Sequence, residues 1–134
     1  MPRDTVSRNY RVTVLGDGGW GTALALVSQR KNNPTLLWSA FPDYAQSLRE
    51  KRENKKFLPG IPIPPEIKIT ADLKEAAEFG EILIIAIPTQ FIRNVLHKLR
   101  DLDLSKKIIL SVAKGIEKKT HLRPSEIVES ILGR

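Results

Sequence analysis

The stretch that decides the fold is residues 12–25, which read VTVLGDGGWGTALA. Four β-compatible residues lead directly into a Gly-x-Gly-x-x-Gly motif, and the motif leads into a helix-forming segment. A strand, a glycine turn and a helix in this order predict the phosphate-binding corner of a dinucleotide-binding fold. A lone glycine motif is weak evidence, but here the segments on both sides of it fit the same interpretation.

The glycines of this motif have distinct expected roles. Gly16 permits the tight turn after the strand, and Gly18 lets the backbone approach a pyrophosphate with no side chain in between. Gly21 allows the helix to pack closely on the strand. The free N–H groups at the start of that helix attract the anion.

The rest of the chain alternates strands with helices, which predicts a doubly wound parallel α/β sheet of the Rossmann-like type. We expect strands at 10–15, 35–39, 67–70, 82–87 (the central strand) and 108–112, and helices near 19–30, 42–54, 72–80, 89–99 and 124–132. Asp72 and Thr89 are expected helix caps, with Glu75 as the reciprocal partner of Asp72. Because segment 54–66 contains four prolines, we expect an ordered loop there.

Length and composition indicate one soluble domain. Residues 1–9 are expected to be a flexible leader, and residues 10–134 a dinucleotide-binding domain. The chain has no cysteine, which excludes disulfides, thiolate metal sites and thiol nucleophiles, and no other metal-ligand pattern stands out. No apolar run is long enough for a membrane span and the N-terminus lacks a signal-peptide core, so a cytoplasmic location is expected.

The formal net charge of +7 raises the question of nucleic acid. Lysine and arginine are spread from Arg3 to Arg134, and the densest run, residues 49–56, also contains acidic residues. Nucleic-acid binders usually gather their basic residues on one face, so no nucleic-acid partner is expected. An attraction for phosphorylated ligands is the milder inference.

Ligands of doubly wound sheets bind beyond the carboxyl ends of the strands. Those ends carry Gly16, Phe41, Pro88 and Lys114, which are therefore expected to converge. Residues 37–42 (LWSAFP) contain neither an acid for the ribose of NAD nor an arginine for the 2′-phosphate of NADP, so the choice between the two cofactors stays open.

Several side chains near these ends have two interpretations. Phe41 either lies against an adenine or covers the sheet edge, and Trp20 packs over the pyrophosphate or against another domain. Lys114 either polarises a carbonyl or holds a phosphate, unless it is simply solvated. His97 and His121 have no partner at ligand spacing, so no catalytic role is expected for them.

Taken together, these residues resemble a known family. Along nearly all of residues 10–132 the chain is similar to the N-terminal, cofactor-binding domain of NAD(P)-dependent glycerol-3-phosphate dehydrogenase. The resembling stretches are residues 14–25, 37–38, 53–60 (ENKKFLPG), 86–90 (AIPTQ) and 113–117 (AKGIE). The glycine motif alone is shared with many dehydrogenases, whereas the combination of 53–60 with 113–117 is much more specific.

The resemblance implies hydride transfer between NAD or NADP and a small phosphorylated substrate. The reaction would interconvert dihydroxyacetone phosphate and sn-glycerol 3-phosphate, which supplies glycerophospholipid synthesis. Lys114 would touch both cofactor and substrate and act in catalysis. The expected cofactor site as a whole is Gly16, Gly18, Gly19, Trp20, Gly21, Ala40, Phe41, Phe57, Pro88 and Lys114.

The chain also departs from the family pattern. Gly19 stands where the family usually has serine, and Ala40 and Phe41 stand where it often has histidine or arginine. The family continues into further strands and a helical substrate domain, so we expect this chain to be inactive or very weak without that domain in cis or trans. A homodimer is left open.

Two alternative functions are retained. One is the cofactor domain of another two-domain reductase of the 3-hydroxyacid or ketopantoate type, against which segment 54–60 argues. The other is a stand-alone nucleotide-binding module that acts through a partner.

Overall fold

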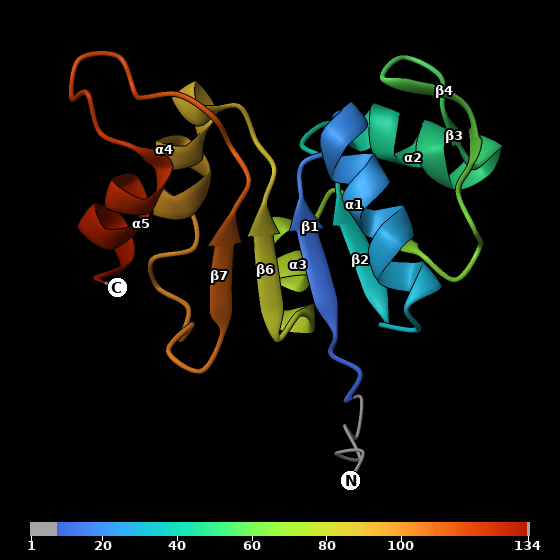
Figure 1. The fold of residues 1–134 in the computed structure, drawn as a ribbon, viewed down its shortest axis with the longest axis horizontal. Helices are drawn as coiled ribbons and strands as arrows, with labels where there is room; N and C mark the ends of the chain where they lie inside the picture. Colours follow the sequence, from blue (N-terminus) through green and yellow to red (C-terminus); the bar gives the residue numbers. More distant parts are fainter. Residues whose placement is uncertain (1–7, 134) are drawn as a thin grey trace, which may run out of the picture.

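A computed structural model describes residues 8–133, and its centre is a five-stranded parallel sheet in the order β5-β2-β1-β6-β7 (Figure 1). The chain runs outward from β1 through β2 to β5, then returns to the other side of β1 for β6 and β7. This reversal is the topological switch point of a doubly wound fold, which confirms the predicted class. The strands are β1 (Val12–Leu15), β2 (Thr35–Trp38), β5 (Lys68–Thr70), β6 (Ile82–Ile85) and β7 (Ile108–Ser111).

Helices cover the two faces of the sheet unequally. α1 (Gly19–Arg30) and α2 (Pro42–Lys51) pack on one face, over the half formed by β1, β2 and β5. The other face is covered by α3 (Leu73–Phe79), α4 (Thr89–His97) and α5 (Pro124–Leu132). Right-handed crossovers on either side of the switch point place the two groups of helices on opposite faces.

The core follows from the apolar runs of the strands. Every residue of β1 and β2 is buried, as expected for parallel strands enclosed on both faces. β6 pairs with β1 on one side and β7 on the other, so it is an interior strand, but the central position expected for it belongs to β1. The predicted apolar stripe after β6, formed by Ile92, Val95, Leu96 and Leu99, is buried.

The expectation of an irregular loop at 54–66 is wrong. β3 (Glu53–Asn54) and β4 (Leu58–Pro62) form a separate two-stranded antiparallel sheet. Proline is tolerated there because a two-stranded sheet has only edge strands, and an edge strand leaves one row of N–H positions unpaired. Gly60 takes a φ of +81°, which accommodates the bend within β4.

Two predicted capping interactions also differ. Asp72 caps α3 by accepting from the Glu75 N–H at 3.2 Å, but the Glu75 carboxylate accepts from the Thr70 hydroxyl instead of closing a capping box. Thr89 is the first residue of α4 rather than its cap, and its hydroxyl donates to the carbonyl oxygen of Lys114 at 2.7 Å. The Glu75 side chain thus joins α3 to the end of β5, and the Thr89 side chain joins α4 to the loop at Lys114.

Most of the expected leader, residues 1–7 of 1–9, lies outside the described residues. Within them, Arg8 forms an ion pair with Glu81 at 2.7 Å. No helix in residues 8–133 has the length and apolar character needed to cross a membrane.

Candidate functional site: a cleft at the carboxyl end of the sheet

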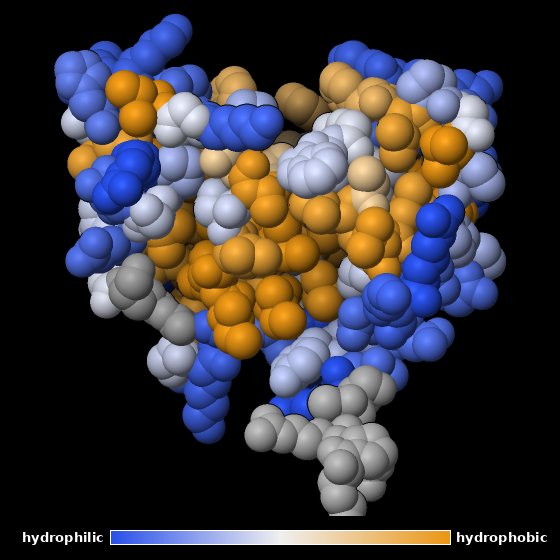
Figure 2. Space-filling view, viewed as in Figure 1, coloured by the Kyte–Doolittle hydropathy of each residue, from blue (hydrophilic) through white to orange (hydrophobic). Residues whose placement is uncertain are grey.

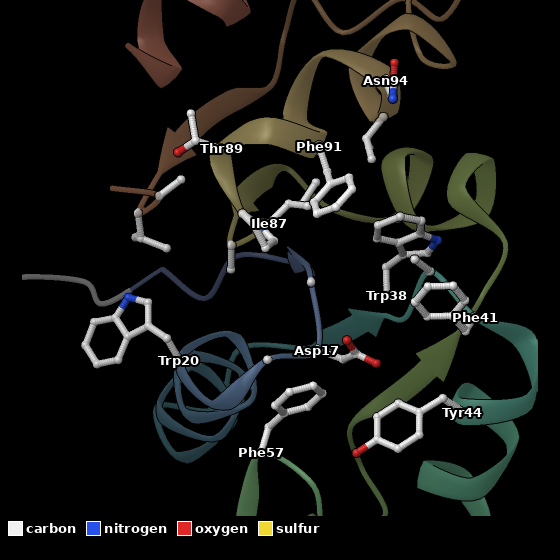
Figure 3. A pocket seen from close by; sticks show the side chains of 18 of the residues that line it. Asp17, Trp20, Trp38, Phe41, Tyr44, Phe57, Ile87, Thr89, Phe91 and Asn94 are labelled. Atoms are coloured by element: carbon white, nitrogen blue, oxygen red, sulfur yellow. The ribbon is translucent and has the colours of Figure 1, made fainter. Parts of the chain in front are cut away.

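A cleft of about 1380 Å³ opens beyond the carboxyl ends of β1, β2, β6 and β7 (Figure 3). This volume exceeds the roughly 300–1,000 Å³ of most small-molecule pockets, which suits an elongated ligand. The predicted residues that line the cleft are Gly16, Gly18, Trp20, Ala40, Phe41, Phe57, Pro88 and Lys114. Gly19 and Gly21 are not among the lining residues and belong to the first turn of α1.

The glycine turn is built from close backbone approaches. Gly16 has a φ of +128°, and a Cβ there would lie 2.5 Å from the carbonyl oxygen of Ala86. A Cβ on Gly21 would lie 2.1 Å from the carbonyl oxygen of Gly16, so α1 packs directly on the turn as predicted. Gly19 is equally constrained, because its Cβ would meet the Phe57 carbonyl oxygen at 2.7 Å. A serine at this position would displace the segment between β3 and β4.

Gly18 is different, because its missing side chain leaves open space. No atom lies within 4 Å of the position that its Cβ would take, and Gly18 borders the cleft. It is the N-cap residue of α1, and no side chain caps that helix. The first intrahelical bond runs from the Thr22 N–H to the Gly18 carbonyl, which leaves the three preceding N–H groups of the first turn for a ligand. An unobstructed, uncapped helix start is a site for an anion such as pyrophosphate.

The short β3–β4 sheet holds this glycine turn through one side chain. Asn54 is completely buried, and its Nδ2 donates to the Asp17 carbonyl at 2.7 Å and to the Thr22 hydroxyl at 2.8 Å. Its Oδ1 accepts from the Tyr44 hydroxyl and from the Phe57 N–H. Burial, and then the nearby Asp17 carboxylate, raise the pKa of Tyr44 above 10.0, so this hydroxyl stays protonated as the donor.

The end of the cleft beyond β2 is largely aromatic. Phe41 is 71% exposed and lies just after β2, where Figure 3 shows it beside Trp38 and Tyr44. Phe91, which is 58% exposed, borders the cleft from α4. The sequence analysis missed Phe91, although it stands outside the buried stripe of its helix, and an exposed aromatic residue off that stripe is a detectable signal. Other lining residues that the sequence analysis did not assign to the site include Asp17, Tyr44, Lys56, Asn94 and Lys98.

The other end of the cleft carries Lys114, whose loop is tied to the start of α4. The Thr89 hydroxyl donates to the Lys114 carbonyl at 2.7 Å, and the Gln90 Nε2 donates to the Ile116 carbonyl at 2.9 Å. The Gln90 Oε1 accepts in turn from the Lys118 N–H at 2.9 Å. The side chain of Lys114 is exposed at the cleft while its backbone is fixed.

A charged pair completes this attachment. Arg93 of α4 donates from Nε and Nη2 to the Glu117 carboxylate, with the Nη2–Oε1 distance at 2.9 Å. Thr120 adds a hydroxyl donor to the same carboxylate at 2.5 Å. The hydrogen bonds from Arg93 lower the pKa of Glu117 below its ordinary 4.5, and the Thr120 hydrogen bond acts in the same direction. Glu117 thus fixes the loop that presents Lys114.

The described residues offer no alternative chemistry of the metal or histidine type. Between residues 8 and 133 no three His, Cys, Asp or Glu side chains gather where they could hold a metal ion. His97 and His121 are both exposed and neither lines the cleft. The doubly wound sheet, the open glycine at an uncapped helix start and the long cleft at the switch point define a dinucleotide-binding domain.

Comparisons with known proteins identify the family. The family described as "NAD-dependent glycerol-3-phosphate dehydrogenase N-terminus" matches residues 11–134. A glycerol-3-phosphate dehydrogenase [NAD(P)+] of Chlorobium phaeobacteroides is 41% identical over 122 residues, which is 91% of this chain and 36% of that protein. The chain therefore belongs to the glycerol-3-phosphate dehydrogenase family and represents its N-terminal, NAD(P)-binding domain.

Solved structures agree with this assignment. The glycerol-3-phosphate dehydrogenase of Coxiella burnetii superimposes with a TM-score of 0.86 at 32% identity, covering 94% of this chain and 38% of that one. The yeast glycerol-3-phosphate dehydrogenase superimposes with a TM-score of 0.79 at 26% identity, covering 94% and 40%. The chain spans little more than a third of the length of the curated relatives it matches.

Proposed function

We propose that this chain is the cofactor-holding part of an enzyme that transfers a hydride between NAD(P)H and dihydroxyacetone phosphate, giving sn-glycerol 3-phosphate for glycerophospholipid synthesis. The observation that carries the proposal is the cleft, because it joins an open phosphate cradle at Gly18 to an exposed lysine at Lys114. The family assignment supports this substrate over the 3-hydroxyacid and ketopantoate alternatives. We place the reaction in the cytoplasm, in keeping with a chain that lacks cysteine.

The residues present fit a dinucleotide. The N–H groups of Gly19 and Trp20 would hold the pyrophosphate at the α1 start, and Ala40, Phe41 and Phe57 would lie along the nucleotide. Pro88 lines the wall between this end and Lys114. When bound, the reduced nicotinamide supplies the hydride.

Lys114 is the residue to which we assign a catalytic role. Its ammonium group would stabilise the negative charge that develops on the substrate oxygen as the carbonyl is reduced. The hydrogen bonds from Thr89 and Gln90 and the Arg93–Glu117 pair keep the Lys114 loop in place, which orients this charge before the substrate arrives.

A further part of the protein is needed to enclose the substrate. The cleft is open to solvent, and an open site lets water reach the reacting groups. The relatives extend well beyond the length of this chain, and we propose that a further domain, in cis or in trans, supplies the phosphate contacts and closes the cleft. By itself the chain would bind cofactor and turn over substrate very weakly or not at all.

An uncovered half of the sheet is where we place this further part. On the face that α1 occupies, Ile82 and Ile84 of β6 are half-buried, and Ile108 and Leu110 of β7 are 58% and 49% exposed. Figure 2 shows this apolar surface across the middle of the molecule, over β6 and β7. Parallel sheets are normally covered on both faces, so an exposed apolar half-face favours a covering partner.

A titration tests the cofactor proposal directly. The purified chain is titrated with NADH and NADPH while tryptophan fluorescence is followed, with Trp20→Phe as the variant that assigns the signal, since Trp20 is 63% exposed at the cleft and Trp38 is nearly buried. Saturable quenching that is reduced in Trp20→Phe supports the proposal. A folded chain that binds neither dinucleotide contradicts it.

A further inference from the structure

An acidic side chain lies beside the end of β2, although residues 37–42, which form and follow that end, contain no acidic residue. Asp17 belongs to the glycine turn, yet its Oδ2 accepts from the hydroxyl of Ser39 at 2.6 Å. Ser39 directly follows β2, is completely buried, and its N–H donates to the Thr70 carbonyl at 2.9 Å. A buried donor at the end of β2, with its own backbone tied to Thr70, therefore fixes the Asp17 carboxylate where dinucleotide folds of this class present the acid that contacts ribose.

The carboxylate remains available to a ligand. Asp17 is partly exposed and lines the cleft, and among the hydrogen bonds of residues 8–133 the Ser39 hydroxyl is the one donor to its side chain. Figure 3 shows the carboxylate directed toward Tyr44 and Phe41 and away from Trp20. Its negative charge is thus turned from the pyrophosphate cradle toward the adenosine end of the cleft.

The arginines, which could bind a 2′-phosphate with two parallel hydrogen bonds, are placed elsewhere. No arginine of residues 8–133 lines the cleft. The two arginines at the end of α2 and just beyond it donate to backbone carbonyls, Arg49 to Ile69 at 3.2 Å and Arg52 to Ile67 at 2.7 Å. The cations that do line the cleft are lysines, Lys56, Lys98 and Lys114, which lack the bidentate geometry of arginine. Asp17 is the lining acid that the buried Ser39 hydroxyl holds at this end.

We propose that Asp17 makes this domain select NAD(H) over NADP(H). Its carboxylate accepts a hydrogen bond from the 2′-hydroxyl of the adenosine ribose, and it repels the 2′-phosphate of NADP(H). In dinucleotide folds the acid that contacts the ribose usually stands at the end of β2, and here Asp17 of the glycine turn takes that role. The inference rests on the proposed function, because it concerns which dinucleotide the cleft holds.

The test compares dissociation constants of NADH and NADPH for the chain and for Asp17→Asn. The variant keeps the shape and can still accept from Ser39, while the backbone carbonyl that Asn54 holds is unchanged. We expect the parent chain to bind NADH about tenfold to a hundredfold more tightly than NADPH. This is the factor in affinity that one hydrogen bond to a charged group contributes. In Asp17→Asn the ratio falls toward one, mainly because NADPH binds better. Asp43→Asn, at another acid that lines the cleft, leaves the ratio unchanged.

A second measurement isolates the ribose contact. 2′-Deoxy-NADH should bind the parent chain less tightly than NADH, and this difference should vanish in Asp17→Ala. An unchanged NADH-to-NADPH ratio in Asp17→Asn, or a parent chain that prefers NADPH, overturns the assignment to Asp17 while the proposed function stands. A parent chain that binds no dinucleotide overturns the proposed function, and this inference with it.

Discussion

Asn54 donates a hydrogen bond to the carbonyl oxygen of Asp17 at 2.7 Å, which joins the short antiparallel sheet to the glycine turn. The two residues are 37 positions apart in the sequence, yet the same amide also reaches Thr22 and the Tyr44 hydroxyl. A single buried side chain thus holds together the turn, α1, α2 and the segment between β3 and β4.

Replacing Asn54 with alanine should therefore destabilise the domain. The change leaves buried donors and acceptors without partners, at about 1–3 kcal/mol for each group that water cannot reach. We expect a loss of about 2–4 kcal/mol in the free energy of unfolding by urea denaturation. Tyr44→Phe, which removes one of these hydrogen bonds, should cost about 1 kcal/mol.

Asn94→Ala is the control, because Asn94 is exposed at the cleft and its change should leave stability within about 0.5 kcal/mol. Equal stabilities for Asn54→Ala and Asn94→Ala would show that the hydrogen bonds of Asn54 do not stabilise the domain.

Two glycines of the turn should separate folding from cofactor binding. A side chain at Gly18 meets open space, so Gly18→Leu should fold but lose NADH binding through obstruction of the pyrophosphate cradle. A Cβ at Gly21 meets the Gly16 carbonyl at 2.1 Å, so Gly21→Ala should lose about 1–3 kcal/mol of stability or fail to fold.

Thermal unfolding and NADH titration of the same two proteins make the comparison. NADH affinity that survives in a folded Gly18→Leu variant would contradict the phosphate-cradle interpretation.

The sequence predicts much of this architecture because its signals are local. The apolar runs of β1 and β6 and the glycine motif each specify one element, and the alternation of elements then determines the doubly wound order. The convergence of Gly16, Phe41, Pro88 and Lys114 on one cleft follows from that order alone.

What the sequence analysis missed depends on contacts between distant residues. The pairing of Glu53 with Pro62 cannot be seen in the composition of a proline-rich segment. The same holds for Asp17, since only the structure brings this residue of the turn to Ser39 beyond β2. Thr89 matches the pattern of a helix cap, but the nearby Lys114 carbonyl takes its hydroxyl instead.

Lys114→Ala should abolish turnover in a complete or reconstituted enzyme while leaving NADH binding largely intact. The lost charge acts on the developing oxyanion, so we expect a fall in kcat of about a hundredfold to a thousandfold. Steady-state reduction of dihydroxyacetone phosphate, followed by NADH absorbance, measures the change. Lys118→Ala is the matched control, because Lys118 is an exposed lysine nearby that does not line the cleft. Unchanged turnover in Lys114→Ala would remove this residue from the mechanism.

The Arg93–Glu117 pair should give the Lys114 loop a dependence on pH. The Arg93 guanidinium holds the pKa of Glu117 below 4.5, so the folded state binds this proton less readily than the unfolded chain. The pair therefore stabilises fully at pH values above 4.5, and its contribution disappears as the pH falls through the lowered value.

Melting temperatures at neutral and acid pH test this relation. Arg93→Gln should melt below the parent chain at pH 7, and the gap should close as the pH falls below 4.5 through the lowered pKa of Glu117. Arg93→Lys keeps the charge but loses the bidentate contact, so its melting temperature should lie between those of Arg93→Gln and the parent chain. A gap that stays constant across this range would show that Glu117 ionisation contributes nothing.

The exposed half of the sheet should show its role through two neighbouring strand residues that point to opposite faces. Leu110 is 49% exposed on the open face, whereas Ile109 packs against the core beneath α4 and α5. Leu110→Glu should change the free energy of unfolding by less than about 1 kcal/mol, while Ile109→Glu should prevent stable folding because it places a charge in the core.

If a further domain covers this face, Leu110→Glu should also weaken recovery of turnover when the chain is mixed with the C-terminal part of a relative. Arg30→Glu, a charge reversal at the end of α1, is the control for a simple change in net charge. Equal recovery in the Leu110→Glu and parent mixtures would mean that the partner docks elsewhere.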